Sequence, residues 1–318
     1  MASPQNCPYC RVVMLPGAKF CHGCGERALG SMKNCPTCKE QNPATAVFCH
    51  HCGHNFDGKK KSKPAETFKS DYNLDFARED HLKEQLRAWF YKDLHRRVNE
   101  EGVPIRHSEY VERTYSTRFR EVLEYRLEQI SRGVLMQWEE GGDAVLPKID
   151  GRLNRAFEGL LDYYFIHFCH DLGEIKLPEA LLKYENARPG KVDACSMVMD
   201  YLDFGHEIET VYTDFITMNV QKLQNACGSF LHADRREKIF FICDLSLSGN
   251  CKEGFAISDR GLYWKAQFSS AHQVQFGGIK ELKFNREYLT INGHFFNANP
   301  GLNLKLYKLL KKLKELNA

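Results

Sequence analysis

The 318-residue sequence has no long hydrophobic run. No segment reaches the roughly 18 consecutive apolar residues that a membrane-spanning helix requires. The polar start MASPQNCPYC also lacks the charged-then-apolar order of a secretion signal. We therefore expect a cytoplasmic protein, and we do not expect a membrane partner.

The sequence also lacks the local motifs that mark common active sites. It contains no phosphate-binding glycine loop, no nucleophile elbow and no H-E-x-x-H motif. Two segments remain ambiguous, HFCHD with His167 and His170, and DFGHEIE with His206 and Glu207. Because HFCHD lies in the aromatic stretch YYFIHFC and has no complementary ligand run, we interpret its histidines as packed, hydrogen-bonded core residues.

Neither segment identifies a substrate. We therefore expect a non-enzymatic protein with no small-molecule substrate that the sequence reveals. An enzyme with an unrecognised site in the helical region remains an alternative.

Paired cysteines are absent after residue 52. Five of the thirteen cysteines occur singly, whereas eight form four C-x-x-C pairs at Cys7, Cys10, Cys21, Cys24, Cys35, Cys38, Cys49 and Cys52. In a cytoplasmic chain such pairs indicate metal binding rather than disulfides. Two residues between thiolates let a tight turn direct both sulfurs at one ion, and two such turns complete the tetrahedron that zinc prefers.

The spacing C-x2-C-x10-C-x2-C occurs twice, and the second copy begins 28 residues after the first. The copies also share a proline in the first pair, an aromatic residue before the second pair and a glycine after it. We expect two Zn2+ ions per chain, each held by four cysteines. Iron, a redox role and histidine ligands are weaker alternatives, and a cross-braced pairing of the repeats remains open.

These tandem repeats, with their CPxC and CxxCG knuckles and the joint GERALGSMKN, resemble a double zinc ribbon of the DZANK type over about residues 5–56. The resemblance implies metal binding and an adaptor role toward protein or nucleic acid. Each ribbon is too small for a hydrophobic core, so metal would supply its folding free energy. We assign residues 1–56 to this domain.

Positive charge is concentrated at the same end. Residues 1–70 carry ten basic and four acidic residues, a balance of +6, whereas the net charge of the whole chain is +3. The segment DGKKKSKPAETFKSDY predicts a flexible basic linker over 57–72. Nucleic-acid binding through this end is therefore an alternative function, although only Tyr9 and Phe56 are available for base stacking.

Residues 73–228 follow a helical period. Apolar side chains recur every three or four residues in three long segments, which contain Leu82, Phe119 and Leu153, and Gly- and Pro-containing breaks separate these segments. The pattern predicts an all-α helical middle domain of five to seven helices.

Residues 229–318 change to short β-type runs: KIFFICDLS, EGFAIS, GLYWKAQF, HQVQF, IKELKF, YLTI and HFFNA. Asn292-Gly293 is a hairpin signal. The order of these runs, the segment EGFAISDRGLYWK and a closing helix resemble a bacterial pleckstrin-homology-like (PH-like) domain. The resemblance implies a β-barrel, and members of the wider fold bind phosphoinositides, peptides or proteins or serve only as scaffolds. We expect peptide or protein binding, with lipid binding and a structural role as alternatives.

The last segment carries a leucine stripe, Leu302, Leu306, Leu309, Leu313 and Leu316. We predict a helix that packs on the barrel with its lysines in solvent. The sequence thus predicts a multidomain, zinc-binding adaptor or regulatory protein that recognises a protein partner.

Overall fold

The computed structural model describes residues 12–13, 32–43, 56, 70 and 72–317. The chain divides into two compact units, Met1–Thr67 and Phe68–Ala318. Helices and sheets of the second unit share extensive packing. The predicted boundaries at residues 56, 72 and 228 stay predictions.

In the first unit, the described residues form a short antiparallel hairpin. Strand β1 (Met32–Asn34) pairs with strand β2 (Gln41–Pro43), with Lys33 opposite Asn42. The hairpin belongs to the second predicted ribbon, and most of both ribbons lies outside the described residues.

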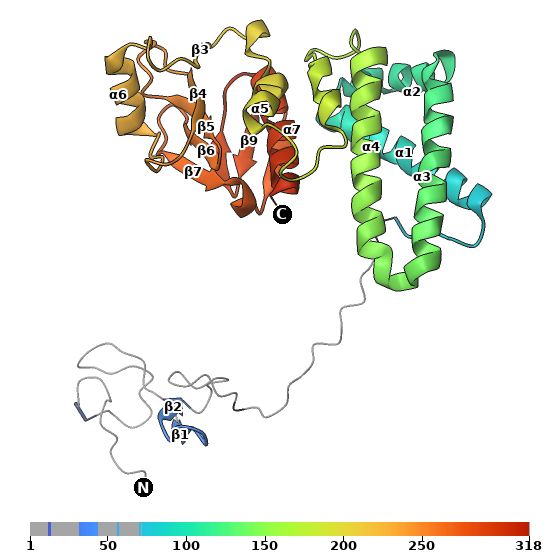
Figure 1. The fold of residues 1–318 in the computed structure, drawn as a ribbon, viewed down its shortest axis with the longest axis horizontal. Helices are drawn as coiled ribbons and strands as arrows, with labels where there is room; N and C mark the ends of the chain where they lie inside the picture. The colour runs from blue at the N-terminus through green and yellow to red at the C-terminus, as the bar shows by residue number, and fades with distance from the viewer. Residues whose placement is uncertain (1–11, 14–31, 44–55, 57–69, 71, 318) are drawn as a thin grey trace. The chain divides into compact units, whose positions relative to one another are not determined.

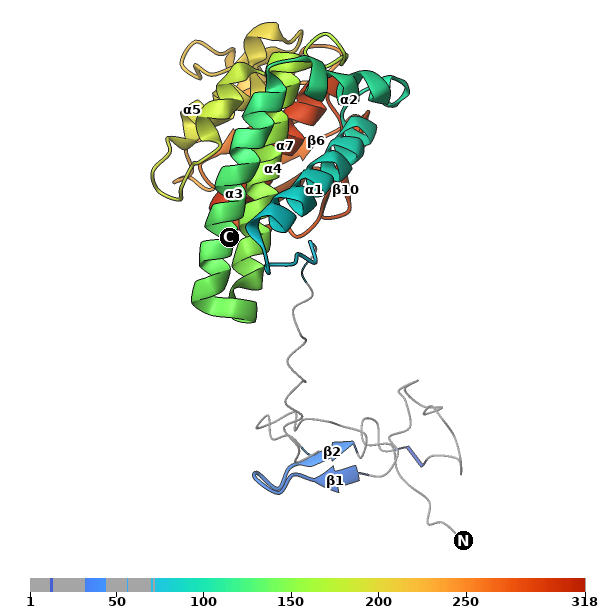
Figure 2. The same ribbon diagram turned by 90° about the vertical axis from the view of Figure 1, so that its right-hand side faces the viewer.

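The second unit begins with four α-helices (Figure 1), α1 (Glu79–Glu100), α2 (His107–Ser116), α3 (Phe119–Gly141) and α4 (Leu146–Phe168). Short 3-10 helices precede α2 and α4, at Pro104–Arg106 and Gly142–Val145. Helices α3 and α4 run side by side, and α1 packs along them (Figure 2). The tight connection between α3 and α4 is possible because Gly142 adopts a φ of 51° and Pro147 lies in the first turn of α4.

The predicted apolar stripes form the core of this helical layer. Leu82, Phe119 and Leu153 are each fully buried, together with the residues that follow them at helical spacing. Burial of one stripe from each long helix explains why the helical period was visible in the sequence. The helical middle region is confirmed.

Three elements connect this layer to the sheets, namely α5 (Ala194–Leu202), β3 (Thr210–Tyr212) and α6 (Val220–Ser229), with 3-10 helices at Glu179–Tyr184 and Phe204–His206. The all-helical prediction is wrong at β3, which pairs antiparallel with the first strand of the C-terminal part. A strand of three residues has no measurable period of its own, so its identity depends on that partner.

Each of the seven predicted β runs contains one strand, β4 (Ile239–Asp244), β5 (Gly254–Ser258), β6 (Gly261–Lys265), β7 (His272–Gln275), β8 (Leu282–Asn285), β9 (Tyr288–Ile291) and β10 (His294–Phe296). A 3-10 turn, Phe276–Gly278, follows β7. Asn292 and Gly293 form the β9–β10 turn with φ angles of 51° and 82°. Both residues therefore adopt the left-handed conformation that the Asn-Gly signal predicts.

The predicted closed barrel is not observed. The described strands form two antiparallel sheets, in the orders β3-β4-β5-β6-β7 and β10-β9-β8. Between β7 and β10 the contacts are made by side chains, because the rings of His272 and His294 stack with centroids 4.2 Å apart. The indole of Trp264 on β6 also donates a hydrogen bond to the carbonyl oxygen of Phe295, at 2.8 Å.

Helix α7 (Pro300–Leu316) closes the fold. Asn299 caps its start by accepting a hydrogen bond from the backbone of Leu302, at 2.8 Å. The predicted packing is confirmed, because Leu302, Leu306, Leu309 and Leu313 are buried in the core of the two sheets. No helix among the described residues has the length and apolar character needed to cross a bilayer.

The prediction that the lysines of α7 lie in solvent is wrong for two of them. Lys305 and Lys308 are buried. Lys308 is buried because α7 lies between two layers: the leucines in its stripe face the sheets, and its opposite face meets the helical layer, on the side of α4 (Figure 1). Lys305 is buried against the segment after α5, where its Nζ lies 2.6 Å from Glu207.

Candidate functional site

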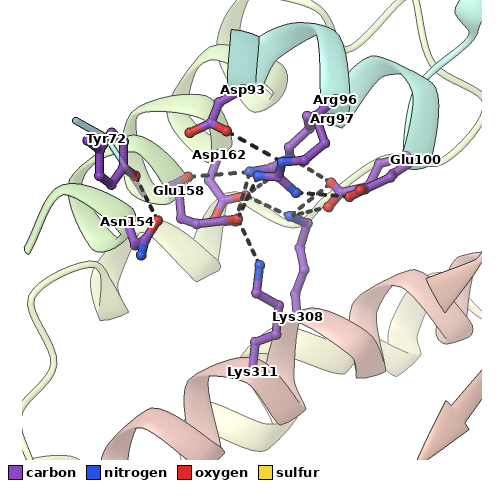
Figure 3. Close-up of polar contacts among 11 residues, drawn as sticks. Tyr72, Asp93, Arg96, Arg97, Glu100, Asn154, Glu158, Asp162, Lys308 and Lys311 are labelled. Carbon is purple, nitrogen blue, oxygen red and sulfur yellow. Dashed lines mark hydrogen bonds and ion pairs between the residues drawn. The ribbon is translucent and has the colours of Figure 1, made fainter. Parts of the chain in front are cut away.

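Charged side chains from three helices meet where α7 contacts α1 and α4 (Figure 3). Each helix contributes residues about one turn apart: Arg97 of α1 and its C-cap residue Glu101, Glu158 and Asp162 of α4, and Lys308 and Lys311 of α7. Residues spaced by three or four positions lie on the same side of a helix. The three helices therefore present charged faces of complementary sign to one another. We call these six residues the ion-pair cluster.

Arg97 is the centre of the cluster. Its side chain is 0% exposed and contacts three carboxylates, with Nε 2.7 Å from Glu101, Nη1 3.3 Å from Glu158, and a further hydrogen bond from Nη2 to Asp162. Burial by itself would lower the pKa of Arg97, but the charges of Asp162, Glu101 and Glu158 outweigh it and raise that pKa. Arg97 therefore stays a cation inside the protein.

Lys308 completes the contact from α7. Its Nζ lies 2.9 Å from Glu101 and 3.0 Å from Asp162, and only 5% of its side chain is exposed. Lys311 lies 2.7 Å from Glu158 in a more exposed position. Burial tends to raise the pKa of Glu158, yet the charges of Lys311, Arg97 and Lys308 lower it overall.

Asp162 behaves in the same way. Burial would raise its pKa, but Arg97 and Lys308 lower it. Both α4 carboxylates are thus held as anions. Because each buried charge has opposite charges within hydrogen-bond distance, the cluster joins the helical layer to α7 with charges that compensate one another.

A cavity of about 480 Å³ opens beside the cluster. Its lining includes Glu158, Lys308 and Lys311 from the cluster, and the aromatic side chains of Tyr184 and Tyr201. The Tyr184 hydroxyl donates a hydrogen bond to Asp200 at 2.7 Å. Charged side chains line part of the cavity, and its cations and carboxylates are largely paired with each other.

The histidine segments differ from the sequence interpretation. His167 and His170 are both exposed, so the prediction of core histidines is wrong. The buried residue of HFCHD is Cys169, and burial raises the pKa of its thiol to about 12. Tyr164 on α4 and Cys169, the C-cap residue of that helix, are buried, whereas the two histidines beside Cys169 are exposed.

The second ambiguous segment, DFGHEIE, forms polar contacts. His206 is exposed with Nδ1 2.8 Å from Asp203, and Glu207 accepts a hydrogen bond from Lys305 at 2.6 Å. Within the described ranges, no three His, Cys, Asp or Glu side chains are arranged to hold a metal ion.

The remaining candidate is the turn of the β1–β2 hairpin, which carries the sequence CPTC. Cys35 is buried and Cys38 is half-buried. The Cys35 N–H donates to the carbonyl of Glu40 at 2.8 Å, and the Lys39 N–H donates to the carbonyl of Cys35 at 2.9 Å. Lys39 adopts a φ of 67°, which reverses the chain directly after the second cysteine.

Such a turn carries both thiols of one pair on a single hairpin tip, which is half of a tetrahedral thiolate site. The other predicted ligands, Cys7, Cys10, Cys21, Cys24, Cys49 and Cys52, lie outside the described residues, so the assignment of all eight cysteines stays a prediction. The soft sulfur donors of the pair suit Zn2+.

Residues 7–53 match the family model of the double zinc ribbon. This match implies that the N-terminal segment binds zinc. Searches of curated proteins and of solved structures found no match for the chain.

The double zinc ribbon was visible in the sequence because its ligands have a local spacing. The ion-pair cluster was not found, because a lysine opposite a leucine stripe is ordinarily a solvent-facing residue. One signal was available: Glu158 and Asp162 lie four residues apart beside the apolar stripe of α4, and both are half-buried. Half-buried charges at this spacing indicate a charged partner elsewhere in the fold.

Proposed function

We propose that this protein is a non-enzymatic adaptor or regulatory protein that recognises a protein partner through its double zinc ribbon. The observation that carries the proposal is the doubled ligand set within residues 7–53, of which the Cys35–Cys38 turn is the described part. Two ribbons, each with four thiolates and one Zn2+, would form a rigid recognition surface without a hydrophobic core.

We further propose that the C-terminal part is a PH-like module that supports partner binding. Support comes from the order of its elements, in which a sheet containing β4 to β7 is followed by the three strands β8 to β10 and then by α7. The fold alone does not define a ligand. The protein-binding role of this module therefore rests on the order of its elements alone.

The non-enzymatic part of the proposal is supported by how the buried charges are used. Arg97, Glu158 and Asp162 have shifted pKa values, and each is engaged with oppositely charged side chains of the ion-pair cluster. Their shifts are explained by contacts that join helices. Structural ion-pair networks perturb pKa values without any catalytic role.

The test is affinity capture with the full chain as bait. Three baits are compared: the natural sequence, the double variant Cys21→Ser with Cys49→Ser, and the control Cys227→Ser, which replaces an exposed cysteine outside the ribbon. We expect the same partner with the natural and control baits, and its loss with the double variant. Equal capture by all three baits would exclude recognition through the ribbon.

Nucleic-acid binding through the basic end is distinguished by its dependence on salt. On duplex DNA the logarithm of affinity should fall with the logarithm of salt concentration by about 0.9 per neutralised phosphate. One observation disfavours base stacking on Phe56, because the Lys33 ammonium lies over that ring, 4.1 Å from its centroid. Undetectable DNA or RNA binding at low salt would leave the protein-adaptor proposal in place.

A further inference from the structure

A second cavity, of about 530 Å³, adjoins the first, and Arg155, Glu185 and Glu315 line both. Four arginines surround it and come from three different elements. Arg126 belongs to α3, Arg152 and Arg155 belong to α4, and Arg188 lies between the Glu179–Tyr184 turn and α5. Every lining residue belongs to Phe68–Ala318. We call this space the arginine cavity.

The charge of the arginine cavity is not balanced. Its lining contains four guanidinium groups but only two carboxylates, Glu185 and Glu315. Arg126 approaches Glu185 at 3.3 Å, and Arg155 approaches Glu315 at 3.3 Å. Both distances exceed the roughly 2.7–2.9 Å of a strong charge-assisted hydrogen bond. The two carboxylates are thus engaged, and the lining keeps a positive excess.

Two of these arginines have N–H groups that are not engaged in hydrogen bonds. Arg152 donates from Nη1 to the carbonyl of Gly133 at 2.9 Å. The Arg188 side chain is exposed and makes no hydrogen bond or ion pair with another residue in the part of the chain that the structure describes. Each guanidinium has five N–H donors in a fixed plane. Most donors of this pair are therefore available to a ligand.

Part of the cavity lining is apolar. It includes Ile130 and Leu160, which are buried, and Leu316 of α7, which is partly exposed. The volume falls within the range of about 300–1,000 Å³ that is usual for small-molecule sites. Small-molecule sites combine apolar lining residues with a few placed polar or charged groups that fix the ligand's orientation.

We infer that the arginine cavity binds a small multivalent anion that carries phosphate or carboxylate groups. Planar guanidinium groups donate two parallel hydrogen bonds to either group, which a lysine cluster does not. Arg152 and Arg188 supply the unengaged donors, and Arg126 and Arg155 add charge at the rim. This site is separate from the double zinc ribbon and does not depend on the adaptor proposal.

The inference is tested by isothermal titration of the full chain with inorganic pyrophosphate and, separately, with citrate, at low ionic strength. The variants are Arg188→Gln and Arg152→Gln. The matched control is Arg120→Gln, an exposed arginine of α3 outside the cavity. Because Arg188 has no described side-chain partner, its replacement should leave folding unchanged, which circular dichroism verifies.

We expect one saturable site in the natural chain and in Arg120→Gln. Each cavity variant should weaken binding at least about tenfold, as expected for the loss of a charged hydrogen-bonding group. Binding of pyrophosphate alone identifies phosphate as the preferred group, and binding of citrate alone identifies carboxylate. Saturable binding of neither anion, or an affinity in both Arg188→Gln and Arg152→Gln equal to that of the natural chain, would overturn the inference.

Discussion

Lys308 shows how much a single residue contributes to the stability of the fold when oppositely charged side chains surround it. Its ammonium contacts Glu101, whose side chain is only 3% exposed, and Asp162. Removing one partner from a buried ion pair leaves the other charge uncompensated, which costs far more than the loss of a surface contact. Lys308 should therefore be far more sensitive to substitution than the exposed Lys314 of the same helix.

We predict that Lys308→Ala lowers the free energy of unfolding by about 3 kcal/mol. The control is Lys314→Ala on the same helix, where the lysine is exposed and should change stability by no more than about 0.5 kcal/mol. Urea denaturation followed by circular dichroism measures both. Equal stabilities of the two variants would show that the ion-pair cluster contributes little.

The carboxylates of the cluster predict a dependence on pH. The pKa values of Glu158 and Asp162 lie below their ordinary values of 4.5 and 3.8 because cations surround them. The unfolded chain consequently binds protons more readily than the folded chain in this range. The contribution of these two carboxylates to the free energy of unfolding is fully present above about pH 5. It is lost as the pH falls through their lowered pKa values.

Unfolding free energies measured between pH 7 and pH 3 should therefore decrease on the acid side. In Glu158→Gln the decrease should be shallower, because one titrating carboxylate is gone. A variant whose pH profile matches that of the natural chain would contradict this assignment.

At the scale of secondary-structure elements, α7 is the helix on which the folding of the two sheets depends. Its leucines fill the core between the two sheets, and each buried leucine contributes about 1.5–3 kcal/mol. The summed loss is comparable to the whole stability of an ordinary domain, about 5–15 kcal/mol. The sheets should not remain folded without this helix.

We predict that a chain ending at Asn299 is insoluble or loses the C-terminal fold. A chain ending at Leu316 is the control, because it lacks only the last two residues and retains the leucine stripe. Solubility and near-ultraviolet circular dichroism report the result. A soluble, folded truncation that has lost binding to anionic liposomes would instead show that α7 is a membrane-surface helix.

At the scale of the whole molecule, the division into Met1–Thr67 and Phe68–Ala318 separates the segment that matches the double zinc ribbon from the segment that contains the described helical and sheet cores. The double zinc ribbon is too small for its own hydrophobic core, so bound zinc should supply its folding free energy, roughly 10–16 kcal/mol at neutral pH. The second unit contains the extended cores of the helical layer and the sheets.

Elemental analysis of protein purified without added metal should find close to two zinc ions per chain. This number follows from two complete sets of four cysteines. A value near zero, or iron in excess of zinc, would contradict the assignment of all eight cysteines to zinc.

Chelation should unfold the ribbon while leaving the helical circular dichroism nearly intact, since the described helices all belong to Phe68–Ala318. The variant Cys21→Ser with Cys49→Ser should behave like the chelated protein. A general loss of helix on chelation would show that the second unit depends on zinc.

Features that depend on near neighbours in the chain could be predicted from the sequence. The C-x-x-C pairs, the apolar stripes of α1, α3 and α4, the seven β runs and the Asn292-Gly293 turn all follow from spacing or from local backbone preference. For the same reason, the half of the candidate zinc site that is described, the turn with Cys35 and Cys38, could be anticipated.

Only the tertiary structure determines which residues from distant segments of the chain contact one another. Lys308 looked like a solvent-facing residue until α4 and α1 placed Asp162 and Glu101 beside it, and the arginine cavity exists only because separate elements bring Arg126, Arg152 and Arg188 together. The two sheets likewise stay separate where side chains, rather than backbone groups, occupy the space between β7 and β10. The physical reason is that local pattern determines which face of an element is apolar, whereas the charge of the opposing surface depends on how the whole chain packs.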